Sequence, residues 1–145
     1  MTNSGFQTNE SSLHCGLLVG DIFIQVTQRS LIQIKGRGEG RRRTKWESDK
    51  GRILQATSNT RQVVIYIEGG QIVYFELDSN TGLLNEIQTE FFQVGIRCLD
   101  ICEVPEGRVR SKFMAAGFED NTVRILSLEP DQPEIFLHKV FNLAL

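Results

Sequence analysis

The 145-residue sequence has no apolar run that approaches the roughly 18 residues needed to cross a bilayer as a helix. Its N-terminus also lacks the charged and apolar regions of a secretory signal peptide. We therefore expect a soluble, intracellular protein whose length is typical of one domain.

Cysteine is scarce, with Cys15, Cys98 and Cys102 as the three in the chain. The spacing of Cys98 and Cys102 lacks the second pair of ligands that a zinc site needs. On a strand these two side chains lie on one face, two pleats apart, which is too far for an easy disulfide. We expect reduced thiols that pack as small apolar groups, with no bound metal and no cofactor.

Histidine, the usual acid or base at neutral pH, occurs only as His14 and His138. They lie near opposite ends of the chain, and neither belongs to a serine or cysteine nucleophile motif. His14 is next to Cys15, but neighbouring residues of a strand point to opposite faces. The sequence therefore predicts a protein that is not an enzyme.

Short β-rich runs make up most of the chain. Helix signals are nearly absent, whereas β-branched and aromatic residues alternate with turn residues about every ten positions, as in an all-β sandwich, barrel or propeller. We predict strands over residues 17–27, 30–34, 52–57, 61–67, 71–78, 84–90, 96–103, 111–116, 122–128 and 134–140.

Two hairpins are the clearest local features. Residues 63–67 and 71–75 are joined through Gly69-Gly70, and glycine takes the positive φ of a tight turn without strain. A second hairpin joins residues 113–117 to 122–126 through residues that favour chain reversal. Because residues 71–78 align with 122–129 at an offset of 51, the hairpins look like copies of one unit.

The repeated unit has the size of one four-stranded, WD40-like propeller blade, about 45 to 50 residues. We predict an all-β fold of about two and a half blades. Such an array is too small to close a ring of four to eight blades, so we expect residues 1–145 to be a partial β-propeller from a larger multi-propeller protein. The predicted parts are the end of one blade (17–34), a basic Gly/Arg-rich loop (35–51), a second blade (52–90) and a third blade (96–140). A sandwich or barrel of eight to ten strands is the alternative.

Positive charge is concentrated in one segment. The formal net charge is −2, yet residues 35–52 contain eight basic and three acidic residues, so this segment is +5 and the remainder is −7. A phosphate-binding loop is excluded, because no Gly-Lys-Ser/Thr ending and no following helix are present. The segment is either a solvated connection between blades or a contact with nucleic acid or an acidic protein. The indole of Trp46 would then either stack on a base or pack on the blade. The residues expected in such a contact are Arg41, Arg42, Arg43, Lys45 and Trp46.

The strand sequences resemble a known family. Residues 69–78 (Gly-Gly-Gln-Ile-Val-Tyr-Phe-Glu-Leu-Asp) resemble the large propeller subunit, subunit 3, of splicing factor 3b. Residues 110–130 (Arg-Ser-Lys-Phe-Met-Ala-Ala-Gly-Phe-Glu-Asp-Asn-Thr-Val-Arg-Ile-Leu-Ser-Leu-Glu-Pro) are similar to it almost position for position. The Gly- and Arg-rich stretch 36–43 departs from that pattern. The family also includes the large damaged-DNA-binding protein and the large cleavage and polyadenylation factor subunit.

The resemblance implies a non-catalytic protein-interaction scaffold in the splicing factor 3b complex of the U2 small nuclear ribonucleoprotein, located in the nucleus. It implies a role in pre-mRNA splicing at branch-site recognition. The implied partners are the HEAT-repeat subunit and small subunits of that complex, with weak or indirect RNA contact and neither a membrane nor a small-molecule substrate. A propeller adaptor of a cullin ubiquitin ligase and a cleavage and polyadenylation subunit are the alternatives.

Overall fold

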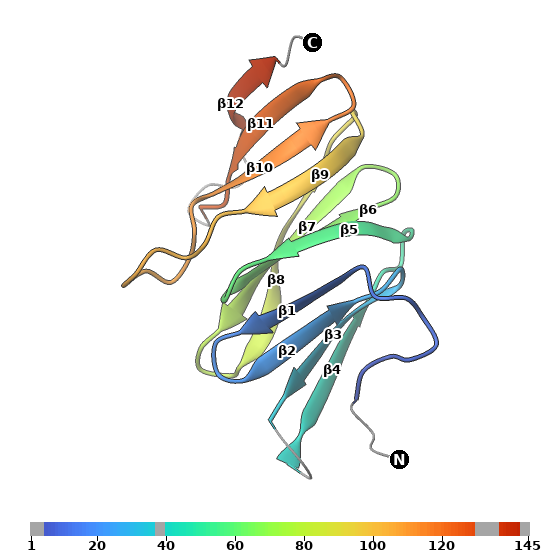
Figure 1. The fold of residues 1–145 in the computed structure, drawn as a ribbon, viewed down its shortest axis with the longest axis vertical. Coiled ribbons are helices and arrows are strands. Elements are labelled where there is room, and N and C mark those ends of the chain that lie inside the picture. Colours follow the sequence, from blue (N-terminus) through green and yellow to red (C-terminus); the bar gives the residue numbers. More distant parts are fainter. Residues whose placement is uncertain (1–4, 37–39, 130–136, 143–145) are drawn as a thin grey trace.

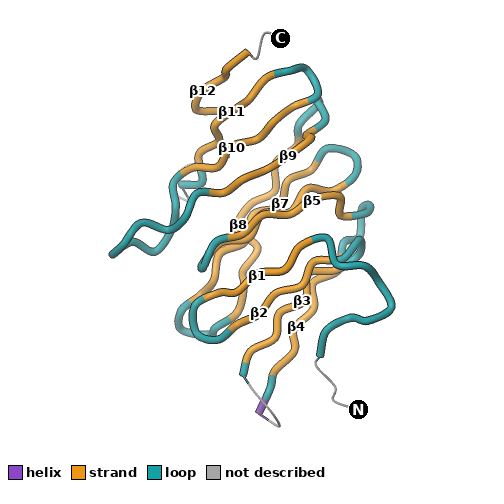
Figure 2. Tube along the Cα trace, in the orientation of Figure 1, coloured by secondary structure: helices purple, strands orange, loops and turns teal. Residues whose placement is uncertain are grey.

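Twelve strands appear in the computed structural model, which describes residues 5–36, 40–129 and 137–142. They form three four-stranded antiparallel sheets, and within each sheet the strands are neighbours in the order of the sequence (Figures 1 and 2). The first sheet contains β1 (His14–Leu18), β2 (Ile22–Val26), β3 (Ser30–Lys35) and β4 (Arg42–Glu47). The second contains β5 (Ile53–Ser58), β6 (Gln62–Ile67), β7 (Gln71–Asp78) and β8 (Leu83–Phe91). The third contains β9 (Ile96–Ile101), β10 (Phe113–Phe118), β11 (Thr122–Ser127) and β12 (Leu137–Asn142). Across these described ranges, no helix is long and apolar enough to span a membrane.

Both predicted hairpins are confirmed. β6 pairs with β7 around Gly69 and Gly70, which have φ angles of 104° and 108°. Glycine adopts such positive φ angles without strain. β10 pairs with β11 through a turn in which the Asp120 carboxylate accepts a 3.1 Å hydrogen bond from the backbone N–H of Thr122. The predicted equivalence of the two units also holds, because β7 and β11 are each the third strand of a sheet.

The first sheet is complete, whereas the sequence predicts only the end of a blade there. The predicted single strand 17–27 is wrong: β1 and β2 form a hairpin, because Gly20 and Asp21 take φ angles of 83° and 58° and reverse the chain. The predicted loop 35–51 is also wrong over β4, which pairs with β3 along its length. β4 is almost entirely exposed and charged, so it lacks the alternating apolar pattern that marks a half-buried strand. The structure therefore contains three four-stranded units, where the sequence predicts about two and a half blades.

The predicted strand 134–140 lies partly outside the described residues, since β12 begins at Leu137. For β12 only the backbone is described, and it pairs antiparallel with β11. The fourth strand of the third unit is thus in the predicted place, opposite β11.

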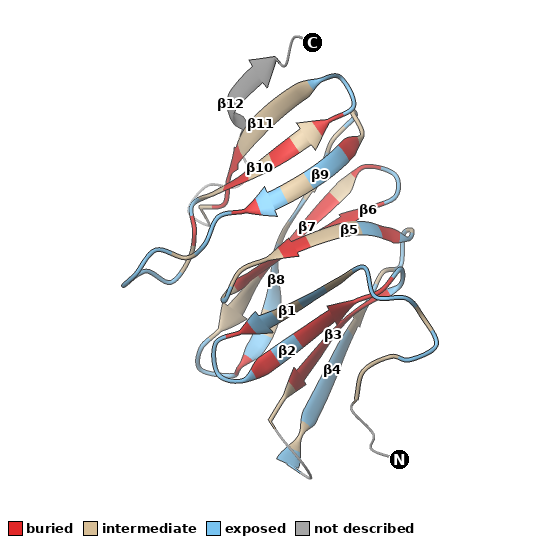
Figure 3. Ribbon diagram, in the orientation of Figure 1, coloured by how far each residue is buried: buried red, intermediate tan, exposed pale blue. Residues whose placement is uncertain are grey.

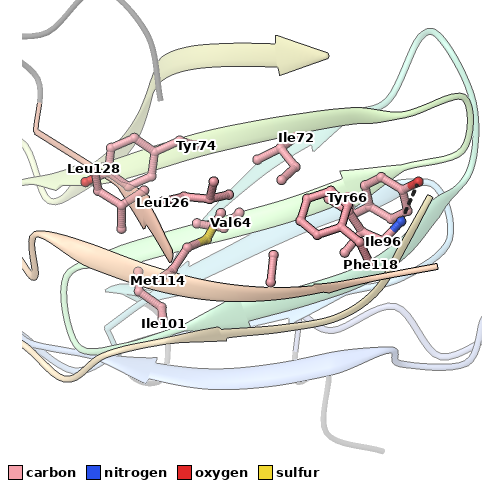
Figure 4. Close-up of a cluster of buried hydrophobic side chains, with 11 residues drawn as sticks. Val64, Tyr66, Ile72, Tyr74, Ile96, Ile101, Met114, Phe118, Leu126 and Leu128 are labelled. Atoms are coloured by element: carbon pink, nitrogen blue, oxygen red, sulfur yellow. Dashed lines mark hydrogen bonds between the residues drawn. The ribbon is translucent and has the colours of Figure 1, made fainter. Parts of the chain in front are cut away.

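The second sheet is packed between the other two. One face of β6 and β7 contributes Val63, Ile65, Val73 and Phe75 to a core shared with the first sheet. The opposite face contributes Val64, Tyr66, Ile72 and Tyr74 to a core shared with the third sheet (Figure 4). Both faces are buried, so residues 63–67 of β6 and 72–75 of β7 are apolar at every position. Each fully buried large side chain contributes about 1.5–3 kcal/mol relative to exposure.

The first strands of neighbouring sheets lie side by side. The Gln55 side chain of β5 donates hydrogen bonds of 3.2 and 2.8 Å to the backbone carbonyls of Ile96 and Arg97 in β9. The His14 ring of β1 lies 2.7 Å, Nε2 to Oγ, from Ser58 of β5. Adjacent first strands of successive four-stranded sheets are the arrangement found around the axis of a propeller.

The three cysteines are free but exposed, so the prediction that they pack as apolar groups is wrong. Cys15 is exposed because side chains alternate along a strand: its neighbours His14 and Gly16 lie against Ser58 of the second sheet, so Cys15 points the other way. Cys98 and Cys102 lie at positions of β9 and its end that point away from the buried Ile96 and Ile101.

Candidate partner-binding surface

The predicted contact residues lie on β4, the outermost strand of the first sheet. Arg42, Arg43 and Lys45 are exposed, and Arg41 immediately precedes the strand (Figure 3). We call Arg42, Arg43 and Lys45 the basic edge. The structure therefore places the predicted residues on a paired strand rather than in a solvated loop.

The side chains of β4 alternate between two faces. Arg42 pairs in register with Lys35 and Trp46 pairs with Leu31, so these side chains face the second sheet. Arg43 and Lys45 pair with residues of β3 that point the other way. The cations of the basic edge thus lie on both sides of the strand.

Trp46 packs on the blade. Its ring meets that of Phe75 edge to face, with centroids 5.4 Å apart and planes at 83°. It lines a cavity of only about 60 Å³ with side chains that include Leu31, Leu84 and Glu86. Of the two interpretations that the sequence left open for Trp46, the structure supports packing.

The opposite face of β4 lies against the N-terminal segment. Arg43 Nε donates a 2.7 Å hydrogen bond to the carbonyl oxygen of Gly5, and Arg41 also lies beside Gly5. Lys45 forms a 3.0 Å ion pair with Glu47 on the same strand. These contacts order the side chains of Arg43 and Lys45 while leaving both residues exposed.

Positive charge is incompletely balanced along β4. Its six residues contain three cations and one carboxylate, that of Glu47. Arg42 stands directly opposite Lys35, and like charges at directly opposed positions of a sheet repel each other. An anion bound at this edge would relieve that repulsion.

A second feature, which the sequence did not reveal, is a buried polar network between the second and third sheets. The amide of Gln62 forms two hydrogen bonds with the backbone of Ser111, accepting from its N–H at 2.7 Å and donating to its carbonyl at 2.9 Å. The same amide donates to the Tyr74 hydroxyl, which donates in turn to Glu76. Arg110 Nε completes the chain with a 2.8 Å bond to Glu76.

Burial favours the neutral form of the Tyr74 hydroxyl. Desolvation first, and the hydrogen bond to Glu76 second, raise the pKa of Tyr74 far above its ordinary value. The hydroxyl therefore remains a donor to Glu76. The hydrogen bond from Arg110 to Glu76 likewise raises the pKa of Arg110, so its guanidinium stays protonated.

The network holds the base of a long loop between β9 and β10. Asn59 Nδ2 donates a 2.8 Å bond to the carbonyl of Cys102 at one end, and Gln62 binds Ser111 at the other. Beyond this base the loop projects from the sheets, and Val109 is 61% exposed (Figure 1). Pro105 and Gly107 between two predicted strands are the sequence signal for such a loop.

His14 and Ser58 line a cavity of about 440 Å³ on the side of the first strands. Burial lowers the pKa of His14, so the ring is neutral near pH 7, and its Nε2 shares one hydrogen bond with the Ser58 hydroxyl. Within the described residues, no His, Cys, Asp and Glu side chains gather in a group of three that is placed to hold a metal ion.

Comparison with known proteins identifies the family. The sequence model described as the RSE1/DDB1/CPSF1 second beta-propeller matches residues 1–144. The chain belongs to this family. The match covers the Gly- and Arg-rich stretch and all three sheets, so the propeller fold expected from the sequence is confirmed and the sandwich or barrel is excluded.

Members of the RSE1/DDB1/CPSF1 family named as splicing proteins are similar over 90% of this chain. Spliceosome-associated protein 130 A of Arabidopsis thaliana is 42% identical over 132 residues. Pre-mRNA-splicing factor rse1 of Emericella nidulans is 40% identical and splicing factor 3B subunit 3 of Danio rerio is 39% identical, each over 132 residues. The chain spans about a tenth of the length of these relatives. The resemblance to the splicing factor 3b subunit is thereby confirmed.

Proposed function

We propose that this chain is a non-catalytic protein-interaction scaffold of the splicing factor 3b complex and acts in pre-mRNA splicing at branch-site recognition in the nucleus. The observation that carries the proposal is the similarity, at 39 to 42% identity, to relatives whose names assign them to splicing. Three packed sheets with loops on a rigid frame suit a role in holding other proteins.

The proposed partners are the HEAT-repeat subunit and small subunits of splicing factor 3b. Two surfaces are suited to contact them: the basic edge of β4 and the projecting loop between β9 and β10. Contact with RNA is proposed to be weak or indirect, because Trp46 is occupied by Phe75 and is not presented for stacking on bases.

A catalytic role is the less supported interpretation. His14 and Ser58 lie within hydrogen-bonding distance, but a nucleophile of this kind also needs a group that orients the histidine and donors for an oxyanion. The hydrogen bond joins the first strands of two sheets, and this structural role accounts for it.

The proposal is tested by competition in nuclear extract. We expect the purified 145-residue chain, added in excess over the endogenous subunit, to lower the yield of spliced product from a model pre-mRNA. Cleavage and polyadenylation of a second substrate in the same extract should be unchanged. A loss of 3′-end cleavage with splicing intact would instead support the cleavage and polyadenylation alternative, and no effect on either would contradict the proposal.

A further inference from the structure

The basic edge belongs to a strand with an unpaired side. β4 is the last strand of its sheet: β3 pairs with one side, and no strand among the described residues pairs with the other. The free side of an edge strand presents backbone N–H and C=O groups that an extended peptide can pair with.

Charge distinguishes β4 from the equivalent strand of the second sheet. β8 also ends its sheet, but its charged residues are Glu86 and Glu90. β4 contains three cations and a single carboxylate in six residues. The two end strands thus differ in charge, and the charge of β4 is complementary to that of an acidic strand.

The placement of the cations suits a peptide strand better than a nucleic acid. Proteins that bind single-stranded nucleic acid place cations along one groove, beside the phosphates, together with aromatic rings that stack on the bases. Arg42 and Arg43 instead point to opposite faces of β4. A strand paired with β4 would itself direct alternate side chains to these two faces. Acidic residues of such a strand would therefore meet Arg42 on one face and Arg43 and Lys45 on the other.

Two of the cations also lack a neutralising carboxylate in their described contacts. The guanidinium of Arg43 is held by the neutral carbonyl of Gly5 and the amide of Gln7. Arg42 stands opposite another cation, Lys35. A carboxylate placed beside Arg42 would offset its repulsion from Lys35, and one beside Arg43 would form a charge-assisted hydrogen bond with its guanidinium.

We infer that the basic edge of β4 binds an acidic segment of a partner protein in extended conformation, which pairs with β4 and extends the first sheet. The inference deepens the proposed scaffold role and rests on it for the natural partner, but the binding itself is a property of the purified chain. Splicing competition and peptide binding can therefore fail independently of each other.

The probe is a synthetic ten-residue peptide that alternates glutamate with valine, labelled for fluorescence anisotropy and titrated with the chain at low salt. We expect saturable binding, together with slower hydrogen exchange at the amides of residues 42–47. A peptide with lysine in place of glutamate should bind at least tenfold more weakly, because it meets the same cations with the wrong charge.

The protein variant that tests the site is Arg42→Glu combined with Arg43→Glu. We expect it to weaken binding at least tenfold, whereas the control Arg52→Glu combined with Arg97→Glu, which reverses two exposed charges outside both proposed contact surfaces, should leave binding within twofold. Circular dichroism of each variant verifies that the fold is retained. Equal binding by the two double variants would overturn the assignment to β4.

Strand pairing is tested separately by a peptide of the same sequence with N-methylated backbone amides, which keeps the charges and loses the donors. We expect its binding to fall at least tenfold, and this result does not depend on how any protein variant folds. Undiminished binding would refute strand pairing. Tighter binding of a ten-nucleotide single-stranded RNA than of the acidic peptide, or self-association of the chain that the peptide cannot compete with, would refute the acidic-peptide assignment.

Discussion

Gln62 lies at the centre of the buried polar network between the second and third sheets. It is fully buried, and its amide binds the backbone of Ser111 on both sides while contacting Tyr74 and Asn59. Sequence alone gives no sign of this role, because the partner residues are far apart along the chain and the network forms only when two sheets pack.

Replacement of Gln62 by leucine should destabilise the chain by about 1–3 kcal/mol, because it leaves the buried N–H of Ser111 without its acceptor. The measurement is the free energy of unfolding in urea. The control is Gln28→Leu at an exposed turn, where a change within about 0.5 kcal/mol is expected. Equal effects of the two substitutions would show that the network contributes nothing specific.

His14 gives the chain a pH dependence of known sign. Burial lowers the pKa of His14 in the folded state, whereas in the unfolded chain the pKa is about 6.5. The unfolded state therefore binds the proton more readily, and the free energy of unfolding should fall as the pH is lowered through that value. Urea unfolding at pH 7.5 and 5.5 measures the fall.

The variant His14→Gln isolates this contribution from that of other titrating groups. It should lose less stability than the wild-type chain between the same two pH values. Parallel behaviour of the two proteins would contradict the assignment of a lowered pKa to His14.

At the scale of elements, the turn between β6 and β7 offers a matched pair of glycines. Both have positive φ, but a Cβ on Gly70 would lie 2.4 Å from the backbone carbonyl oxygen of Phe92, whereas a Cβ on Gly69 meets nothing within 4 Å. A side chain at either position therefore costs backbone strain, but only at Gly70 does it also clash with neighbouring atoms.

Gly70→Ala should accordingly be more destabilising than Gly69→Ala by about 1–3 kcal/mol, the usual cost of forcing an atom into occupied space. The free energy of unfolding of the two variants, measured side by side, gives the difference. A Gly69 variant that is as unstable as the Gly70 variant would mean that strain alone governs this turn.

The strands that could be predicted from the sequence are those with buried faces or glycine turns. β6, β7, β10 and β11 were identified because apolar runs and turn residues define both their interior and their ends. β4 was missed because an exposed charged strand owes its structure to backbone pairing with β3, which leaves no apolar pattern. The break between β1 and β2 was missed because apolar residues flank Gly20 and Asp21 on both sides.

The sequence predicted which residues make up the candidate site, but not the directions of their side chains or the packing around Trp46. Its cations were identified by charge density, yet their division between two faces follows from the register of β4 on β3. The environment of Trp46 depends on Phe75, a residue of another sheet, and such long-range packing is not encoded in a local motif.

At the scale of the whole molecule, three similar sheets share two cores and differ mainly in their exposed edges. The positive segment and the negative remainder of the chain give these edges distinct electrostatic character. A scaffold needs this combination, because the common core provides rigidity and the different edges provide separate contacts.

The proposed scaffold role is tested by affinity purification of the tagged chain from nuclear extract, with nuclease treatment and mass spectrometry. We expect recovery of the HEAT-repeat and small subunits of splicing factor 3b after RNA has been removed. The control is Ile65→Asp, which places a charge in a fully buried position and should abolish recovery by unfolding the second sheet. Recovery of cullin components, or of no splicing subunit by a folded and soluble chain, would show that the chain is not a scaffold of splicing factor 3b.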